Sequence, residues 1–245
     1  MTAESIIYLL IRLFSGFMSG VFGIGGGSIR IPLLNLAGLP LLNAFAINLL
    51  IIPLSSSIGA ASQRRNINKK VAVYMIIGGT LGSITGALLA GLISMLGLAV
   101  CFVAVSVVTV IGIYLDRIAP ALARKISPGP RSIIAGSLAL SLIVGMRGGS
   151  GGCLFPPFLR AMKLDIHKAI ATSLFVTIFT AMAGVVIYWR RGDIVWLPAM
   201  FMLIGSMIGV GIGSRASLKA KPTWLETGLT ILVIALASIT IYKAL

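Results

Sequence analysis

The chain has 245 residues, of which 58% are hydrophobic and only 10% are charged, whereas soluble domains carry about 25% charged residues. This composition excludes an ordinary soluble globular protein. The formal net charge of +15 would suggest nucleic acid binding in a soluble protein, but in a membrane protein lysine and arginine mark the cytoplasmic loops. No basic stretch is interleaved with aromatic residues, so we expect the lipid bilayer, and no nucleic acid, among the partners.

The first half of the chain, residues 5–118, contains four apolar segments, and about 20 such residues suffice to cross a bilayer. The segments cover residues 5–36, 40–62, 71–93 and 97–118. The first segment is broken by Gly23-Ile-Gly-Gly-Gly27 and then closed by Pro32. Backbone polar groups that leave a helix inside a bilayer are tolerated only where they line a cavity or are buried in protein. The break therefore indicates a site inside the membrane.

A linker at 119–130, which contains Pro120, Pro128 and Pro130, leads into a second half, residues 131–243. Its apolar segments cover residues 131–161, 166–189, 194–215 and 223–243. The first of these is also broken, in the run Arg147-Gly-Gly-Ser-Gly-Gly-Cys-Leu-Phe-Pro156. Matched breaks in the two halves of a membrane chain are typical of the binding sites of secondary transporters.

The two halves share landmarks in the same order. Pro32 matches Pro156 at a shift of 124 residues, and the stretch 44–49 matches 169–174 at a shift of 125. The glycines at spacing four also correspond, with Gly78, Gly82 and Gly86 in one half and Gly205, Gly209 and Gly213 in the other. Such glycines allow helices to pack closely in lipid. The pattern predicts a single transmembrane transporter domain, residues 1–245, made by internal duplication.

The distribution of basic residues predicts how the halves are oriented. If every segment crosses once, the basic residues at 160–168 and 215–221 fall on the outer side, against the positive-inside rule. If each broken segment instead enters and returns as a hairpin, they join those at 64–70 and 117–131 on the cytoplasmic side. We therefore predict an all-α polytopic membrane protein of eight to ten membrane elements, in two inverted-topology repeats with both termini outside. A single unwound span remains the alternative.

The charged residues near the breaks favour an anionic substrate. The five acidic residues all fall at segment ends or in loops, so no carboxylate is placed to carry a proton or bind sodium inside the membrane. Arg147 directly precedes the second glycine run, and Arg30 follows the first. A guanidinium beside the unpaired N–H groups of a half-helix suits an oxyanion. The alternative is that either arginine reaches an interface or binds carbonyl groups freed by the break.

Polar residues on the next segments can complete the site. Asn48 in the first half and the pair Thr172-Ser173 in the second occupy matching positions, although interhelical hydrogen bonding would also explain them. The candidate substrate-binding residues are Gly25, Gly26, Gly27, Ser28, Arg30, Asn48, Arg147, Gly149, Ser150, Gly151, Gly152, Thr172 and Ser173. The sequence has no nucleophile–base pair, metal-ligand cluster or paired carboxylates, so we expect no enzyme activity, catalytic residue, metal or cofactor.

The run from Gly16 to Gly27 with Pro32 resembles the signature of the sulfite exporter (TauE/SafE) family, also called the toluene-sulfonate uptake permease (TSUP) family, and Ala171-Thr-Ser-Leu174 resembles its recurring segment. The resemblance implies transport of sulfite, sulfonates or other organosulfur anions across the cell inner membrane. Two positions depart from the family pattern: Arg147 stands where the first half has Gly23, and Asn48 replaces the expected serine.

These observations lead to one functional expectation and one alternative. We expect a secondary transporter or facilitator that exports small oxyanions by alternating access, because a negative cell interior contributes about 2.3 kcal/mol per charge per 100 mV to their exit. The alternative is a membrane assembly or partner subunit that transports nothing. A homodimer is compatible with the sequence, since nothing in it separates an oligomer face from a lipid face.

Overall fold

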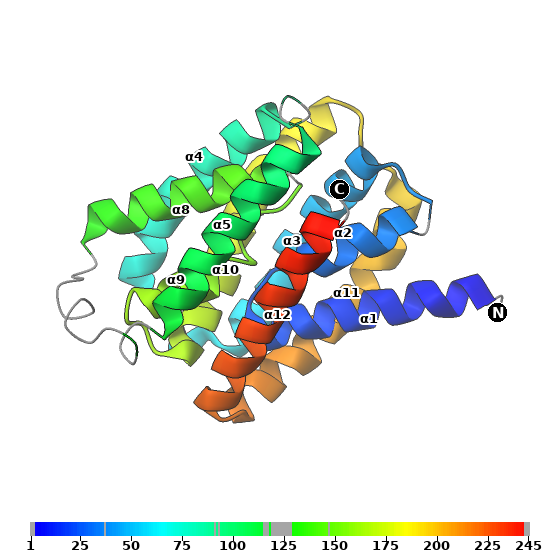
Figure 1. Ribbon diagram of the computed structural model, residues 1–245. Helices are drawn as coiled ribbons and strands as arrows, with labels where there is room; N and C mark the ends of the chain where they lie inside the picture. The colour runs from blue at the N-terminus through cyan, green and yellow to red at the C-terminus, as the bar shows by residue number, and fades with distance from the viewer. Residues whose placement is uncertain are drawn as a thin grey trace.

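The computed structural model describes residues 3–36, 38–90, 92, 94–114, 118, 129–146 and 148–242. These residues form a helical bundle in which no strand occurs within the described ranges (Figure 1). The helices are α1 (Ala3–Phe22), α2 (Gly27–Leu36), α3 (Leu41–Ser62), α4 (Lys69–Leu88), α5 (Met95–Ile113), α8 (Pro130–Gly145), α9 (Phe155–Ala161), α10 (Ile166–Arg190), α11 (Trp196–Lys219) and α12 (Pro222–Tyr242), with a short 3-10 helix at Arg64–Asn66.

Four of the described helices are long and apolar enough to cross a membrane. These stretches are Leu42–Ser62, Lys69–Leu88, Ile166–Arg190 and Pro222–Ile239. With shorter apolar helices such as α8 they confirm the predicted all-helical membrane fold, while the predicted number of eight to ten membrane elements stays a prediction. Most of the predicted linker, residues 119–128, lies outside the described residues.

Both predicted helix breaks are present. The chain leaves α1 after Phe22 through Gly23, Gly25 and Gly26, whose φ angles are 70°, 73° and 72°. It leaves α8 after Gly145 through a longer loop in which Gly148 and Gly151 have φ angles of 67° and 83°. Side chains disfavour this left-handed region, whereas glycine adopts it freely. The glycine clusters therefore allow both turns inside the bundle.

The first broken segment is a hairpin. Helix α1 runs parallel to α11, since Gly16 faces the backbone of Ser206 and Gly20 that of Val210. Helix α2 then turns back, because Leu34 near its end packs in one cluster with Ala44 and Ala199, which lie at the starts of α3 and α11. The start of α1 and the end of α2 thus lie at the same end of the bundle (Figure 1).

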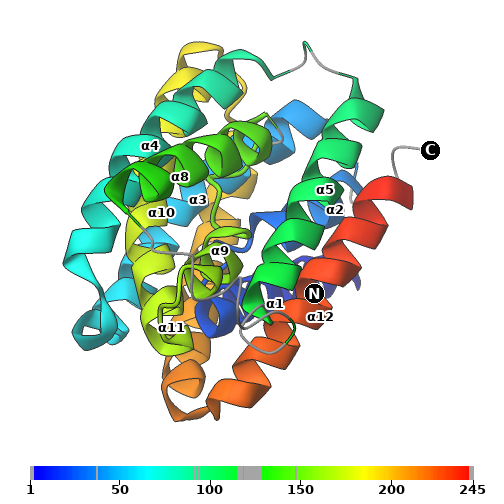
Figure 2. The same ribbon diagram turned by 60° about the vertical axis from the view of Figure 1, so that its left-hand side comes forward.

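The second broken segment is a hairpin that opens at the other end. Helix α8 runs in the same direction as α4, since Gly78 faces Ile134 and Gly86 faces Leu142. The two helices lie side by side (Figure 2). Helix α9 turns back, since the ring of Phe158 lies against Gly136 near the start of α8. This end of the bundle, where α4, α8 and α10 begin, is called the basic end below.

Charge separates the two ends. The basic end holds the described cationic residues Arg64, Arg65, Lys69, Lys70, Arg131, Arg160, Lys163, Lys168, Arg215, Lys219 and Lys221, nearly all of them exposed. At the opposite end Asn43 Nδ2 donates to the Asp193 carbonyl over 2.9 Å, and Arg190 and Arg191 lie beside this loop.

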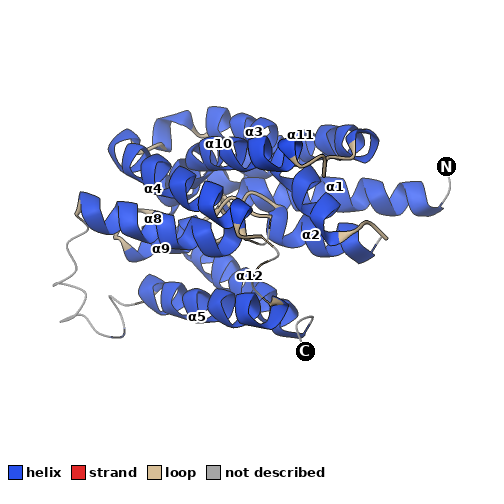
Figure 3. Cartoon of the chain, turned by 90° about the horizontal axis from the view of Figure 1, so that it is seen from above, coloured by secondary structure: helices blue, strands red, loops and turns tan. Residues whose placement is uncertain are grey.

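The helices are arranged around a central pair. Helices α3 and α10 pack together, α1 and α11 pack on one flank, and α4 and α8 pack on the other. Helices α5 and α12 lie side by side as a separate layer (Figure 3). The glycine series face bare backbone: Gly82 faces the Leu138 carbonyl and Gly209 the Leu13 carbonyl. Their predicted role in helix packing is confirmed.

Candidate functional site

The two glycine loops meet at the centre of the bundle. We call residues Gly23–Gly26 the first glycine loop and residues 148–154 the second. A Cβ atom added to Gly152 would lie 3.1 Å from the Ile24 carbonyl oxygen, and one added to Gly25 would lie 3.7 Å from Ser150 Oγ. The two breaks, more than a hundred residues apart in sequence, therefore touch.

Each loop is held by the central helix of the opposite half. Ser173 Oγ on α10 donates to the Gly23 carbonyl over 2.7 Å, and Asn48 Nδ2 on α3 donates to the Gly148 carbonyl over 2.9 Å. Donors and acceptors are both separated by 125 residues along the chain, the shift at which the sequence matches Asn48 to Ser173. The predicted pairing of these two side chains thus corresponds to matching contacts. Gly148, and not Arg147 as the sequence pattern suggested, is therefore the counterpart of Gly23.

Arg30 in the first turn of α2 supplies the positive charge at this junction. Its side chain is 0% exposed. Its Nη1 donates to Asn48 Oδ1 over 2.9 Å, and its Nη2 donates to Ser206 Oγ over 3.0 Å. Both acceptors are neutral, and Nε has no hydrogen-bond partner among the described residues.

The described carboxylates bind other groups. Asp165 accepts from the backbone at the start of α10, Asp193 pairs with Arg191 over 3.2 Å, and Glu226 pairs with Arg160 over 2.7 Å. A buried charge without a counter-ion is costly. A cationic group in this state at the centre of a membrane protein is suited to binding an anion.

Two serines beside Arg30 were not among the sequence candidates. Ser206 accepts from the guanidinium, and the buried Ser19 Oγ has no partner in the described structure. From the position of a Cβ atom on Gly26, Ser19 Cβ is 3.4 Å away and Arg30 Nη2 is 3.0 Å away. Ser19 could have been identified from the sequence, because it lies inside the Gly16–Gly27 motif. Ser206 could not, because it follows Gly205 in a glycine series that indicated only helix packing.

The other candidates are divided between the junction and its surroundings. Ser150 lies at the junction, with Oγ unpartnered and buried and with its carbonyl accepting from Thr180 over 2.9 Å. Thr172 is buried but faces away, since its Oγ1 accepts from the Asn68 backbone N–H over 3.0 Å near the basic end. Arg147 and the side chain of Ser28 lie outside the described residues.

The remaining candidate glycines provide close packing. Gly27 lies directly against the Asn48 amide. Gly149 lies against Val144 and Gly151 against Phe155, and Gly152 would place a Cβ atom 2.7 Å from Thr177 Cγ2. A side chain at any of these positions would displace the neighbouring group.

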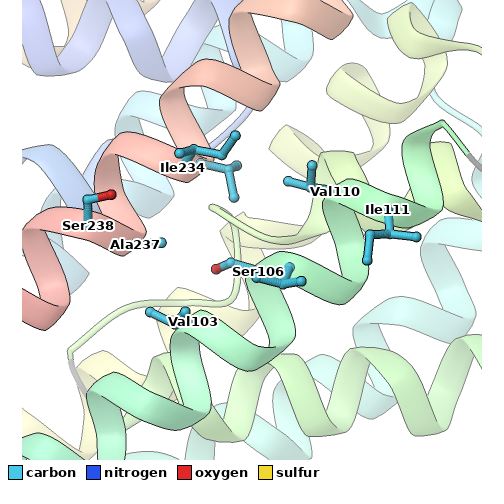
Figure 4. Close-up of a pocket in the computed structure, with 9 residues that line it drawn as sticks. Val103, Ser106, Val110, Ile111, Ile234, Ala237 and Ser238 are labelled. Carbon is cyan, nitrogen blue, oxygen red and sulfur yellow. The ribbon is translucent and has the colours of Figure 1, made fainter.

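A separate pocket of about 310 Å³ lies between α5 and α12 (Figure 4). It is lined by Val103, Ser106, Val107, Val110, Ile111, Val233, Ile234, Ala237 and Ser238. No lining residue is charged, and two serines supply the only polar side chains. This pocket therefore has no charged side chain, in contrast to the junction at Arg30.

Comparison with known proteins shows the family of the chain. The family model described as "Sulfite exporter TauE/SafE" matches residues 8–240. The chain belongs to this family. Within the TauE/SafE family it is 26% identical to the probable membrane transporter protein YunE of Bacillus subtilis, over 98% of each chain. It is 23% identical to the probable membrane transporter protein ORF9 of Sinorhizobium sp, over 94% of this chain and 90% of the relative.

A third TauE/SafE-type relative is the probable membrane transporter protein YfcA of Escherichia coli K12, 26% identical over 87% of this chain and 80% of the relative. No solved structure matches the chain. These relatives are described as membrane transporters and not as enzymes. Within the described residues no group of three histidine, cysteine or acidic side chains could hold a metal ion.

Proposed function

We propose that this chain is a transporter or facilitator that moves small oxyanions, in particular sulfite or sulfonates, out across the cell inner membrane. The observation that carries the proposal is Arg30, a guanidinium with no exposed surface that donates to the neutral side chains of Asn48 and Ser206. An oxyanion can replace one or both of these acceptors and form charge-assisted hydrogen bonds, which are stronger than neutral ones.

Other features at the junction support an anion of small size. The first glycine loop leads into α2, so backbone N–H groups at the start of that helix lie close to Arg30, and helix N-termini favour negative charge. The unpartnered hydroxyl groups of Ser19 and Ser150 can donate to further oxygens. Gly25, Gly26 and Gly27 leave no Cβ atoms in this space, and Ser28 and Arg147 belong to the proposed site by sequence position.

The two hairpins support alternating access. They open at opposite ends of the bundle and touch at their tips, which is the arrangement of inverted repeats around a midplane site. We propose that residues 5–118 and 131–243 form these repeats and that rocking one against the other exposes Arg30 to each side in turn. The basic end is the cytoplasmic side by the positive-inside rule, which leaves both termini outside.

Flux measurements in proteoliposomes test this function. We expect sulfite or methanesulfonate flux that accelerates when an imposed potential drives the anion, because each charge carries about 2.3 kcal/mol per 100 mV. Arg30→Gln is expected to remove this flux, and Arg30→Lys to retain part of it. Arg131→Gln at the exposed start of α8 is the matched control, since it removes an arginine outside the site.

Two outcomes would contradict the proposal. One is flux that ignores both the potential and the Arg30→Gln substitution. The other is a folded wild-type protein that neither transports nor is thermally stabilised by sulfite, sulfate or methanesulfonate, since a specific ligand raises apparent stability by mass action.

A further inference from the structure

We propose that Asn48 couples occupancy of the Arg30 site to the position of the second glycine loop. The inference rests on the proposed function, because it assumes that an anion binds Arg30. It assigns Asn48 a positioning role in addition to lining the site. The substrate would thereby influence the half of the protein that does not contain Arg30.

The geometry gives Asn48 two partners at once. Its Oδ1 accepts from Arg30 Nη1 over 2.9 Å, and its Nδ2 donates to the Gly148 carbonyl over 2.9 Å. The side chain is 0% exposed, so both contacts lie away from bulk solvent. A single amide thus joins the guanidinium of the first half to the glycine loop of the second.

The surrounding contacts allow the amide little freedom. Gly27 lies directly against Asn48 Nδ2, so that any side chain at Gly27 would displace it. Phe45, one turn earlier on α3, packs against Gly148 with no room for a Cβ atom. The second loop therefore rests on α3 through one aromatic contact and one hydrogen bond.

Anion binding would change the first of the two amide contacts. An oxyanion that takes the Nη1–H facing Asn48 deprives Asn48 Oδ1 of its donor. A buried carbonyl-type oxygen without a donor is costly, so the amide is expected to turn towards another donor. Turning moves Nδ2 away from Gly148 and releases the loop. The coupling works in both directions, since a ligand that favours the released loop is bound more tightly when the loop is already free.

The opposite half contains a matched contact without the coupling. Ser173 Oγ holds the Gly23 carbonyl over 2.7 Å, at positions shifted by 125 residues. Among the described residues the Arg30 guanidinium hydrogen-bonds to Asn48 and Ser206 and not to this hydroxyl. Ser173→Ala therefore loosens one glycine loop by the loss of one hydrogen bond while the link from Arg30 to Gly148 is preserved.

Hydrogen–deuterium exchange of the full-length protein in lipid nanodiscs tests the coupling, with sodium sulfite compared against sodium chloride at equal ionic strength. In the wild type we expect sulfite to raise amide exchange in residues 148–154 about fivefold, the change in an equilibrium constant produced by losing one neutral hydrogen bond. In Asn48→Ala we expect fast exchange with and without sulfite, while sulfite still raises the melting temperature. In Ser173→Ala the sulfite response of residues 148–154 is expected to persist.

Asn48→Asp provides a second test if the alanine variant folds poorly. The carboxylate keeps the shape and still accepts from Arg30 but cannot donate to Gly148. Loop exchange should then be fast, and sulfite should no longer raise the melting temperature because the carboxylate occupies the guanidinium. A sulfite response in Asn48→Ala as large as in the wild type overturns the coupling alone. A wild type with no anion response in flux or melting temperature overturns the proposed function and the coupling with it.

Discussion

The two halves of the bundle place different side chains in matching surroundings. In the first half, Arg30 Nη2 lies 3.0 Å from the Cβ position of Gly26 and bonds to Ser206. In the second half, 125 residues later, Phe155 Cζ lies 2.6 Å from the Cβ position of Gly151. Both side chains are fully buried. Each side chain thus lies against a glycine 125 residues from the other, while one position holds a guanidinium and the other a phenyl ring.

The neighbours of Arg30 and Phe155 also differ in polarity. Ser206, which binds Arg30, corresponds to Gly79 at the shift of the glycine series, and a Cβ atom on Gly79 would lie 3.4 Å from Phe155 Cζ. A serine thus lies beside the guanidinium, and a glycine lies beside the phenyl ring and leaves space for it. If Arg30 binds the anion as proposed, only the first half provides the guanidinium at this position, and the second half provides an apolar ring.

The largest expected effect is that of replacing Phe155, the apolar member of the compared pair. Phe155→Ala removes a buried ring and should lower the free energy of unfolding by about 4 kcal/mol through lost contacts and a cavity. Because no charge changes, the variant should retain its preference for anions over neutral solutes. Phe155→Leu, which fills most of the space, is the control. Thermal unfolding in detergent and proteoliposome flux measure the two properties, and a loss of anion selectivity at wild-type stability would reverse the assignment.

Arg30→Met should show the opposite pattern. Flux should fall about a hundredfold, at the upper end for a lost charge-assisted hydrogen bond. The free energy of unfolding should fall by only about 1–2 kcal/mol, because relief of the buried charge offsets part of the cost of leaving Asn48 Oδ1 and Ser206 Oγ without their donor. Arg147→Gln, assayed in parallel, establishes whether the second arginine contributes. Equal losses of stability and flux would indicate a structural role for Arg30.

The glycine series should affect both halves equally. Gly82→Ala and Gly209→Ala each bring a methyl group against a backbone carbonyl of the neighbouring helix, and overpacking of this kind costs about 2 kcal/mol. Gly211→Ala on the same α11 is the control, because its Cβ atom would be 3.6 Å from Ile58 Cγ2, an ordinary contact. Melting temperatures measure the effect. A large loss in only one half would contradict the shared scaffold.

The smallest effect is expected at Thr172. Thr172→Val leaves the Asn68 N–H without its acceptor and should cost about 1 kcal/mol of stability. Anion flux per folded molecule should be unchanged, because this hydroxyl faces the start of α4. An increase in the KM for sulfite without a loss of stability would contradict this and indicate that Thr172 contacts the substrate.

The local sequence predicted those features of the fold that depend on a single physical rule. Apolar length indicated the membrane helices, and the glycines at Gly23–Gly26 and Gly148–Gly151 marked both breaks because only glycine enters the left-handed region freely. The basic residues predicted two hairpins because one orientation gathers them at one end. The candidate site was predicted less completely. Thr172 and Ser173 are neighbours in sequence but lie about 100° apart around a helix, so only Ser173 reaches a glycine loop.

The sequence by itself determined that the chain is a helical membrane protein with two glycine breaks and arginines beside them, because composition and backbone preferences act locally. Only the tertiary structure decided which groups meet. Arg30 binds Ser206 across 176 residues of chain, and Asn48 binds Gly148 across 100. These contacts depend on how α2, α3 and α11 cross inside the bundle, where a buried guanidinium must find acceptors from whichever helices are adjacent.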